Sequence, residues 1–169
     1  MRSFVAISLP QNDLLAGVIS ENKNMGKKVE GRNLHLTLKF LGEISDSDKI
    51  ADSLDEIRFQ KFTLTLKGLG AFPSQHNGRV LFVRAFPEDK LGELAAKVDS
   101  RTRGIPLDHP FTPHITLLRT KERRDFSGVI EKYGQTVFMV QDVSSFCLYE
   151  SKLTSNGPIY REIRRYQLM

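Results

Sequence analysis

The chain has 169 residues, 40% of them hydrophobic, which suits one compact domain or a small bilobal one. Its 25 Lys and Arg against 20 Asp and Glu give a net charge of +5, which favours a polyanionic partner. The single cysteine, Cys147, excludes an intrachain disulfide and a cysteine-rich zinc site. The apolar run from Phe4 to Leu9 is too short for a signal peptide or a membrane span. We therefore expect a cytoplasmic protein that binds no membrane.

The first half of the chain predicts strand, helix, strand, helix and strand. The first two strands cover residues 4–7 and 35–38, and alternation of apolar and polar residues predicts a third from Phe62. Ser45, with Asp48 three residues on, predicts a capping box at the start of the second helix. Apolar residues at helical spacing mark the two helices: Leu15, Val18 and Ile19, then Ile50, Leu54 and Ile57.

The second half predicts the same order of elements. Strands are expected at residues 82–85, 114–117, 137–140 and 145–149, and the apolar and basic stretch 160–168 is interpreted as a further strand. Two helices lie between them, marked by apolar residues at helical spacing: Leu91, Leu94, Ala95 and Val98, then Phe126, Val129, Ile130 and Tyr133.

The two halves match each other in order and spacing. Phe4 corresponds to Phe82, Pro10 to Pro87 and the His35 motif to the His114 motif, at offsets of 78, 77 and 79 residues. The turn-forming stretch 73–78 is the best candidate junction. We expect one α+β domain over residues 1–169 with pseudo-two-fold halves near 1–75 and 79–169. Each lobe should be a mainly antiparallel sheet with helices on its outer face, and a central cleft should separate the lobes.

Both halves carry a His-x-Thr strand. In an extended strand, His35 and Thr37 point one way, with Asn33 and Lys39 in the same row, while the leucines between them face the core. His114 and Thr116 repeat this arrangement. Related by the repeat, the two pairs can face each other across a cleft.

Two imidazoles suit in-line displacement at phosphorus, because one removes a proton from the attacker while the other protonates the leaving oxygen. The Thr37 and Thr116 hydroxyls would donate to the non-bridging oxygens. One His-x-Thr alone is typical of an ordinary half-exposed strand histidine, and only the duplicated frame favours catalysis. A zinc site is disfavoured, since two imidazoles lack a third ligand in a spacing motif, and His76 and His109 fall in loop-like sequence. No metal or cofactor is expected.

Three longer strings resemble a known family. Residues 33–43 (NLHLTLKFLGE) and 111–119 (FTPHITLLR) are similar to the two motifs of the two-histidine phosphoesterases, and specifically to those of the RNA 2′,3′-cyclic phosphodiesterases, also called RNA 2′,5′-ligases. Residues 148–153 (LYESKL), with Gly157 and Tyr160 after them, resemble the C-terminal pattern of that family. The similarity spans almost the whole chain.

The resemblance implies a bilobal fold with a central cleft, hydrolysis of a cyclic phosphate to a 2′-phosphate, and a weak reverse activity that joins RNA ends by a 2′,5′ linkage. It makes His35 the proton donor and His114 the proton acceptor, which the internal symmetry alone leaves undecided. It also implies that Arg119 contacts phosphate. Strict alternation points Arg119 away from His114, so a strand end or a bulge after Thr116 is required to redirect it.

Other functions remain open at this level. A non-catalytic RNA-binding module fits the basic charge, although such platforms present aromatic residues where this chain shows His and Thr. Another cyclic phosphate or a 2′,5′-linked oligonucleotide is an alternative substrate. The expected partner is RNA with a 2′,3′-cyclic phosphate end, tRNA fragments among the candidates, bound by a monomer. Lys39, in the row of His35 and Thr37, is the candidate contact to the RNA backbone.

Overall fold

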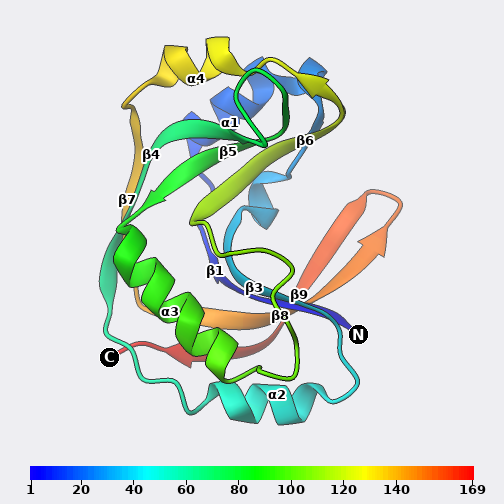
Figure 1. The fold of residues 1–169 in the computed structure, drawn as a ribbon, viewed down its shortest axis with the longest axis vertical. Coiled ribbons are helices and arrows are strands. Elements are labelled where there is room, and N and C mark those ends of the chain that lie inside the picture. Colours follow the sequence, from blue (N-terminus) through cyan, green and yellow to red (C-terminus); the bar gives the residue numbers. More distant parts are fainter.

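The computed structural model describes residues 1–169 and has an α+β fold, as expected (Figure 1). No helix is both long enough and apolar enough to cross a membrane. The predicted helices and strands are all present, although the second helix ends at Leu54, before Ile57, and two 3-10 turns occupy Lys23–Met25 and Gly31–Asn33. In chain order the elements are β1 (Arg2–Ser8), α1 (Asp13–Glu21), β2 (Lys27–Lys28), β3 (His35–Glu43), α2 (Ser47–Leu54), β4 (Phe62–Phe72), β5 (Gly78–Phe86), α3 (Glu88–Ser100), β6 (His114–Arg124), α4 (Ser127–Tyr133), β7 (Val137–Val143), β8 (Ser145–Thr154) and β9 (Gly157–Gln167).

The strands form two antiparallel sheets that exchange elements between the sequence halves. The first sheet has the order β3-β1-β8-β9 and the second β2-β6-β5-β4-β7. The strand β4 therefore lies in the sheet of β5 and β6, and β8 lies beside β1. As a consequence, residues 73–78 turn between two paired strands of one sheet, and the sequence halves do not coincide with the sheets.

The structure also corrects two details of the sequence analysis, the offset between the first strands of the two halves and the cap of the second helix. Ser8 lies opposite His35 and Arg84 opposite His114, so β1 and β5 correspond at an offset of 76 residues instead of 78. A shift of two residues preserves the face of a strand, which is why the repeat was still recognisable. The second helix is capped by Asp46, whose carboxylate accepts from the Lys49 amide at 3.0 Å, and not by Ser45, because an aspartate one residue on serves as well.

The helices cover one face of each sheet and leave the histidine face free. Helix α1 packs on β6, α2 on β9 and α4 on β4, while α3 contacts both β3 and β5. The main hydrophobic core lies under these helices. A second, smaller cluster of Phe4, Ala6, Cys147 and Tyr149 lies on the other face of the first sheet, with Tyr160 packed against it. The strands β3 and β6, which carry the two motifs, contact each other across the sheets.

Candidate active site

Two equivalent β-bulges interrupt the strands that carry the histidines. In β3, Thr37 pairs with Ala6 and Lys39 pairs with Val5. Leu38, between them, is therefore an extra residue without a partner. In β6, Thr116 pairs with Phe82 and Leu118 pairs with Leu81. Leu117 is therefore the extra residue. Each bulge sends two consecutive side chains to the helix side and returns the following one to the histidine face.

The bulges decide where two expected site residues point. Arg119 is exposed and returns to the face of His114 and Thr116, so the redirection that its proposed phosphate contact requires is present. The equivalent position on β3 is Phe40, a residue that is 42% exposed. The two halves of the site thus share His and Thr but differ at this third position, where one carries a cation and the other an aromatic ring.

The expectation that Lys39 shares the row of His35 is wrong. The bulge turns its side chain into the protein, where it is 1% exposed. Its Nζ donates to Asp99 Oδ1 at 2.7 Å, Thr102 Oγ1 at 2.9 Å, Thr102 O at 3.1 Å and Ile105 O at 2.6 Å. With these donors used inside the fold, Lys39 is not available to an RNA backbone.

Both catalytic candidates are oriented in the same way by the backbone. The Nδ1 atom of His35 lies 2.6 Å from the carbonyl oxygen of Asn33, and Nδ1 of His114 lies 2.6 Å from that of Thr112. A carbonyl only accepts, so Nδ1 carries the hydrogen in each ring. The Nε2 atom is then free to accept a proton in the neutral form and to donate one in the charged form.

The charge of Arg119 influences the pKa of both imidazoles. Burial lowers the pKa of His35 and that of His114 below the usual value, and the carbonyl bound at each Nδ1 opposes this effect. The charge of Arg119 lowers the pKa of both rings, and the charge of His114 lowers that of His35. Arg119 therefore lies within electrostatic reach of both histidines, and the ligand-free site favours neutral imidazoles.

Two aromatic rings that contact each other pack against His35. The Phe4 ring is 4.9 Å away between centroids, and the Tyr160 ring is 5.2 Å away and nearly perpendicular. Burial raises the pKa of the Tyr160 phenol while the charge of Arg119 lowers it, so Tyr160 also belongs to this surface. Sequence analysis connected Tyr160 to function only through the C-terminal pattern and did not single out Phe4 or Phe40.

His114 has a similar aromatic support on the second sheet. Its ring lies 5.0 Å from Phe72 and 5.4 Å from Phe82, which stack on each other at 4.3 Å. A Cβ at Gly70 would come within 2.5 Å of the Phe82 ring, so glycine is required for this ring to lie flat on β4.

The remaining candidate nucleophiles and ligands lie elsewhere. His76 is exposed on the turn before β5, 3.5 Å from Asp125, and His109 is exposed in the loop before β6. Burial raises the pKa of the Cys147 thiol to about 11, so it remains protonated near neutral pH. No three His, Cys, Asp or Glu side chains cluster so as to hold a metal ion.

Comparisons with known proteins identify the family of the chain. The family model of the 2′-5′ RNA ligase superfamily matches residues 14–153. The RNA 2′,3′-cyclic phosphodiesterase of Archaeoglobus fulgidus is 32% identical over 99% of this chain and 100% of its own length, and that of Methanocaldococcus jannaschii is 34% identical over 98% and 100%.

Solved structures show the same fold. Thermus thermophilus TT0787 matches with a TM-score of 0.77 and 29% identity, over 99% of this chain and 97% of that one. Escherichia coli LigT complexed with 3′-AMP matches with a TM-score of 0.76 and 29% identity, over 99% and 98%. Since the family model covers most of the chain and full-length relatives exceed 30% identity, the chain belongs to the 2′-5′ RNA ligase superfamily.

Proposed function

We propose that this protein hydrolyses the 2′,3′-cyclic phosphate at an RNA end to a 2′-phosphate, with His35 and His114 as its acid and base. The observation that carries the proposal is the matched pair of imidazoles. Each has Nδ1 bound to a carbonyl two residues earlier and Nε2 free, and both lie within the field of Arg119. The names of the relatives support the same substrate.

The reaction needs two proton transfers. Neutral His114 accepts a proton from water at Nε2 as the water oxygen forms a bond to phosphorus. The bond from phosphorus to the 3′ oxygen breaks, and protonated His35 gives its Nε2 proton to that oxygen. The product is a 2′-phosphate with a free 3′-hydroxyl, and solvent exchange restores both histidines. The order of the two roles rests on the family resemblance, because the geometry of the two rings is equivalent.

The phosphate is held by groups that face the histidines. Thr37 and Thr116 lie two residues after each imidazole on the same strand face, and their hydroxyls are suited to donate to the non-bridging oxygens. Arg119 adds a permanent positive charge and up to two parallel donors. Charge on those oxygens grows in the transition state, so these donors stabilise it more than the bound substrate. No step requires a metal ion.

The asymmetry between Phe40 and Arg119 gives the substrate an orientation. An exposed aromatic ring offers a face on which the terminal nucleobase can stack, whereas a guanidinium favours phosphate. A 5′-hydroxyl can also take the place of water as attacker, with the same proton transfers. The product is then a 2′,5′ linkage, and we expect this joining to be weak in dilute solution because water competes.

The test is turnover of a nucleoside 2′,3′-cyclic phosphate in buffer that contains a chelator. We expect a 2′-phosphate as the sole product, loss of turnover in His35→Ala and His114→Ala, and wild-type turnover in His76→Ala, whose imidazole is exposed on a turn. Activity that disappears with the chelator and returns with zinc or magnesium would contradict the mechanism. A 3′-phosphate product would reverse the orientation of the substrate.

A further inference from the structure

The internal symmetry creates two equivalent ways for a chain to leave the site. Past the bulges, β3 continues from Phe40 and β6 continues from Arg119, at equivalent positions. Residues 40–48 contain three acidic side chains and no basic one, whereas residues 119–127 contain four basic and two acidic side chains. On the β3 side, Glu43 is paired with the N-terminal ammonium at 2.8 Å and lies opposite Arg2. The surplus of unpaired cations is therefore at the β6 exit, which attracts a polyanion more strongly.

The cations at the β6 exit outnumber the carboxylates there, Glu122 and Asp125, and form no ion pair with them. Lys121, Arg123 and Arg124 are exposed, and none of them takes part in an ion pair of the molecule. Arg123 donates only to the carbonyl oxygen of Asn77, at 3.2 Å. Of the two acidic residues there, Asp125 caps the Ser127 amide and lies near a histidine. The positive field of this segment is thus directed at solvent.

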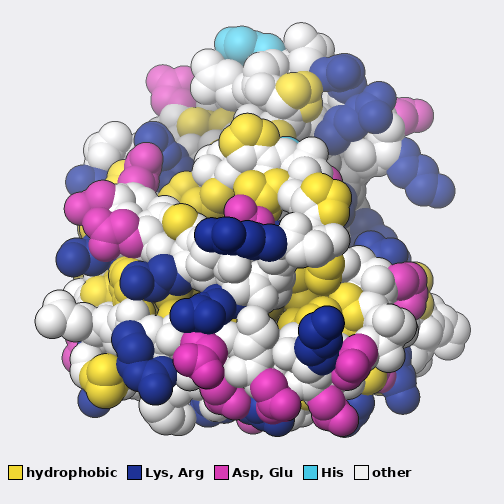
Figure 2. Space-filling model, turned by 60° about the horizontal axis from the view of Figure 1, so that its bottom comes forward, with side chains coloured by type: hydrophobic (Ala, Val, Ile, Leu, Met, Phe, Trp, Pro, Cys, Tyr) yellow, Lys and Arg dark blue, Asp and Glu magenta, His cyan; other side chains and the backbone are white.

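The neighbouring strand extends this charge up to the site. In the register of β2 and β6, Lys27 lies directly opposite Arg119, so their side chains share one face of the sheet. Arg119 pairs with Val80 and Arg124 with Gly78, so β6 bulges between these two arginines and its basic side chains gather over a short length of β5. Figure 1 places the end of β6 at the upper right, and Figure 2 shows Lys and Arg side chains gathered on that side.

We propose that the RNA chain 5′ to the cyclic phosphate leaves the site along β6 and that its phosphates bind the β6 basic strip, defined as Lys27, Lys121, Arg123 and Arg124. This inference rests on the proposed function for the position of the RNA end. Bound cations release counterions from a polyanion, which makes such contacts strong at low salt and weak at high salt. The segment past Phe40 has no such run of cations, so the path along β6 is favoured over the opposite one.

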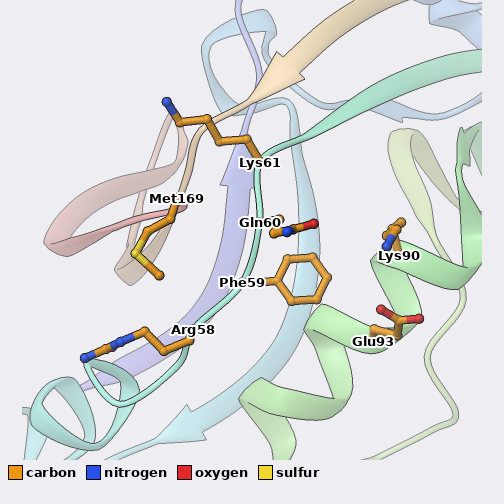
Figure 3. Close-up of a pocket in the computed structure, with 7 residues that line it drawn as sticks. All are labelled: Arg58, Phe59, Gln60, Lys61, Lys90, Glu93 and Met169. Atoms are coloured by element: carbon orange, nitrogen blue, oxygen red, sulfur yellow. The ribbon is translucent and has the colours of Figure 1, made fainter.

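The far end of the molecule provides a matched control surface. Figure 3 shows a hollow there lined by Arg58, Phe59, Gln60, Lys61, Lys90, Glu93 and Met169. Its cations do not converge. Lys61 and Lys90 lie on opposite sides of the hollow, and Arg58 already donates to backbone carbonyls of its own segment. In Figure 2 the end that faces the viewer mixes both signs of charge. Removal of lysines here changes net charge without touching the strip.

The experiment compares two double variants with the same change in net charge, Lys121→Glu/Arg124→Glu in the strip and Lys61→Glu/Lys90→Glu as the control. Binding of a 5′-labelled decanucleotide that ends in a 2′-phosphate is followed by fluorescence anisotropy over a range of salt. In the strip variant we expect Kd to rise tenfold or more and the slope of log K against log salt to fall by about 1.4, at about 0.7 for each phosphate contact. The control should stay within about twofold of wild type.

Catalysis gives a second readout. The gain in kcat/KM from a mononucleotide to a decanucleotide cyclic phosphate should disappear in the strip variant and persist in the control. Equal effects in the two variants, or an unchanged salt slope in the strip variant, would overturn the proposal. A polyglutamate peptide that competes as well as RNA would reassign the strip to an acidic protein. Because binding is measured without turnover, a wild type that binds through the strip but hydrolyses nothing would reject the proposed function alone.

Discussion

Lys39 and Asp99 form an ion pair of 2.7 Å between Nζ and Oδ1 that joins the strand of His35 to the end of helix α3. The same ammonium also binds the backbone at Thr102 and Ile105, in the segment that leads from α3 toward His114. The side chain of Lys39 is 1% exposed, whereas that of Asp99 is 42% exposed. Lys39 is therefore a structural link between the two halves of the site and not a ligand for substrate.

Replacement of Lys39 tests this assignment. Lys39→Met keeps the length of the side chain but leaves buried carbonyl oxygens without a donor, and we expect the free energy of unfolding to fall by about 2–4 kcal/mol. Lys49→Met, at an exposed lysine of α2, should change it by no more than about 0.5 kcal/mol. Urea unfolding measures both values. A Lys39 variant of wild-type stability with weakened RNA binding would restore the role that strand alternation predicts.

Thr37 and Thr116 should support turnover through their hydroxyl groups and not through the packing of their side chains. Thr37→Val and Thr116→Val conserve the β-branched side chain and lose the donor, so we expect each to lower kcat by about 10- to 1000-fold with little change in unfolding free energy. Thr37→Ser and Thr116→Ser keep the donor and should recover most of the rate. Steady-state turnover of a cyclic mononucleotide decides the matter. Serine variants as slow as the valine variants would indicate a packing role.

Lys39 and Arg119, which follow the two bulges, show which parts of the site could be predicted from the sequence. Helices were predictable because their apolar faces are local patterns, as in α3. The faces of Lys39 and Arg119 were not, because a bulge depends on the register with a neighbouring strand, and strict alternation misplaces every residue beyond it. For Arg119, the family motif indicated a place on the histidine face despite this difficulty. Lys39 had no such support, and its prediction failed.

The placement of strands from both sequence halves in each sheet could not be predicted from the sequence, for a related reason. Each half has the same order of elements, and nothing local distinguishes a β4 that pairs with β1 from one that pairs with β5. The pairing is a long-range choice, favoured by the short turn at 73–78 that lets β4 and β5 form a hairpin. The rings that pack against His35, Phe4 and Tyr160, come from β1 and β9. Their contact with His35 therefore also depends on this topology.

Arg119 should control the titration of both histidines. Its charge lowers the pKa of His35 and of His114, so Arg119→Met should raise both values and increase the protonated fraction of each ring at neutral pH. The limb of the pH–rate profile that reports the neutral base should then move to higher pH. NMR titration of the imidazole Cε1–H signals in phosphate-free buffer measures the shifts. Arg79→Met, at an exposed arginine of β5, is the control and should leave both pKa values in place. Unmoved signals in Arg119→Met would place its guanidinium away from the site.

The two histidines can be assigned separate roles by changing the leaving group. Alanine at either position removes one proton transfer, so each variant is slow on the natural substrate and simple loss of activity does not separate them. A cyclic substrate with sulfur at the 3′ position expels a thiolate, which needs little protonation. His35→Ala should therefore recover much of its lost rate on the sulfur substrate, because the missing acid is no longer needed.

His114→Ala should remain slow on both substrates, because water still has to lose a proton as it attacks. The ratio of rates on the sulfur and oxygen substrates, measured for wild type and both variants, isolates this difference from any shared loss of phosphate binding. Recovery in His114→Ala instead would reverse the two roles, which the equivalent Nδ1 contacts at 2.6 Å allow geometrically. Recovery in neither variant would mean that the imidazoles act chiefly by binding the phosphate, together with Arg119, and that the protons move through solvent.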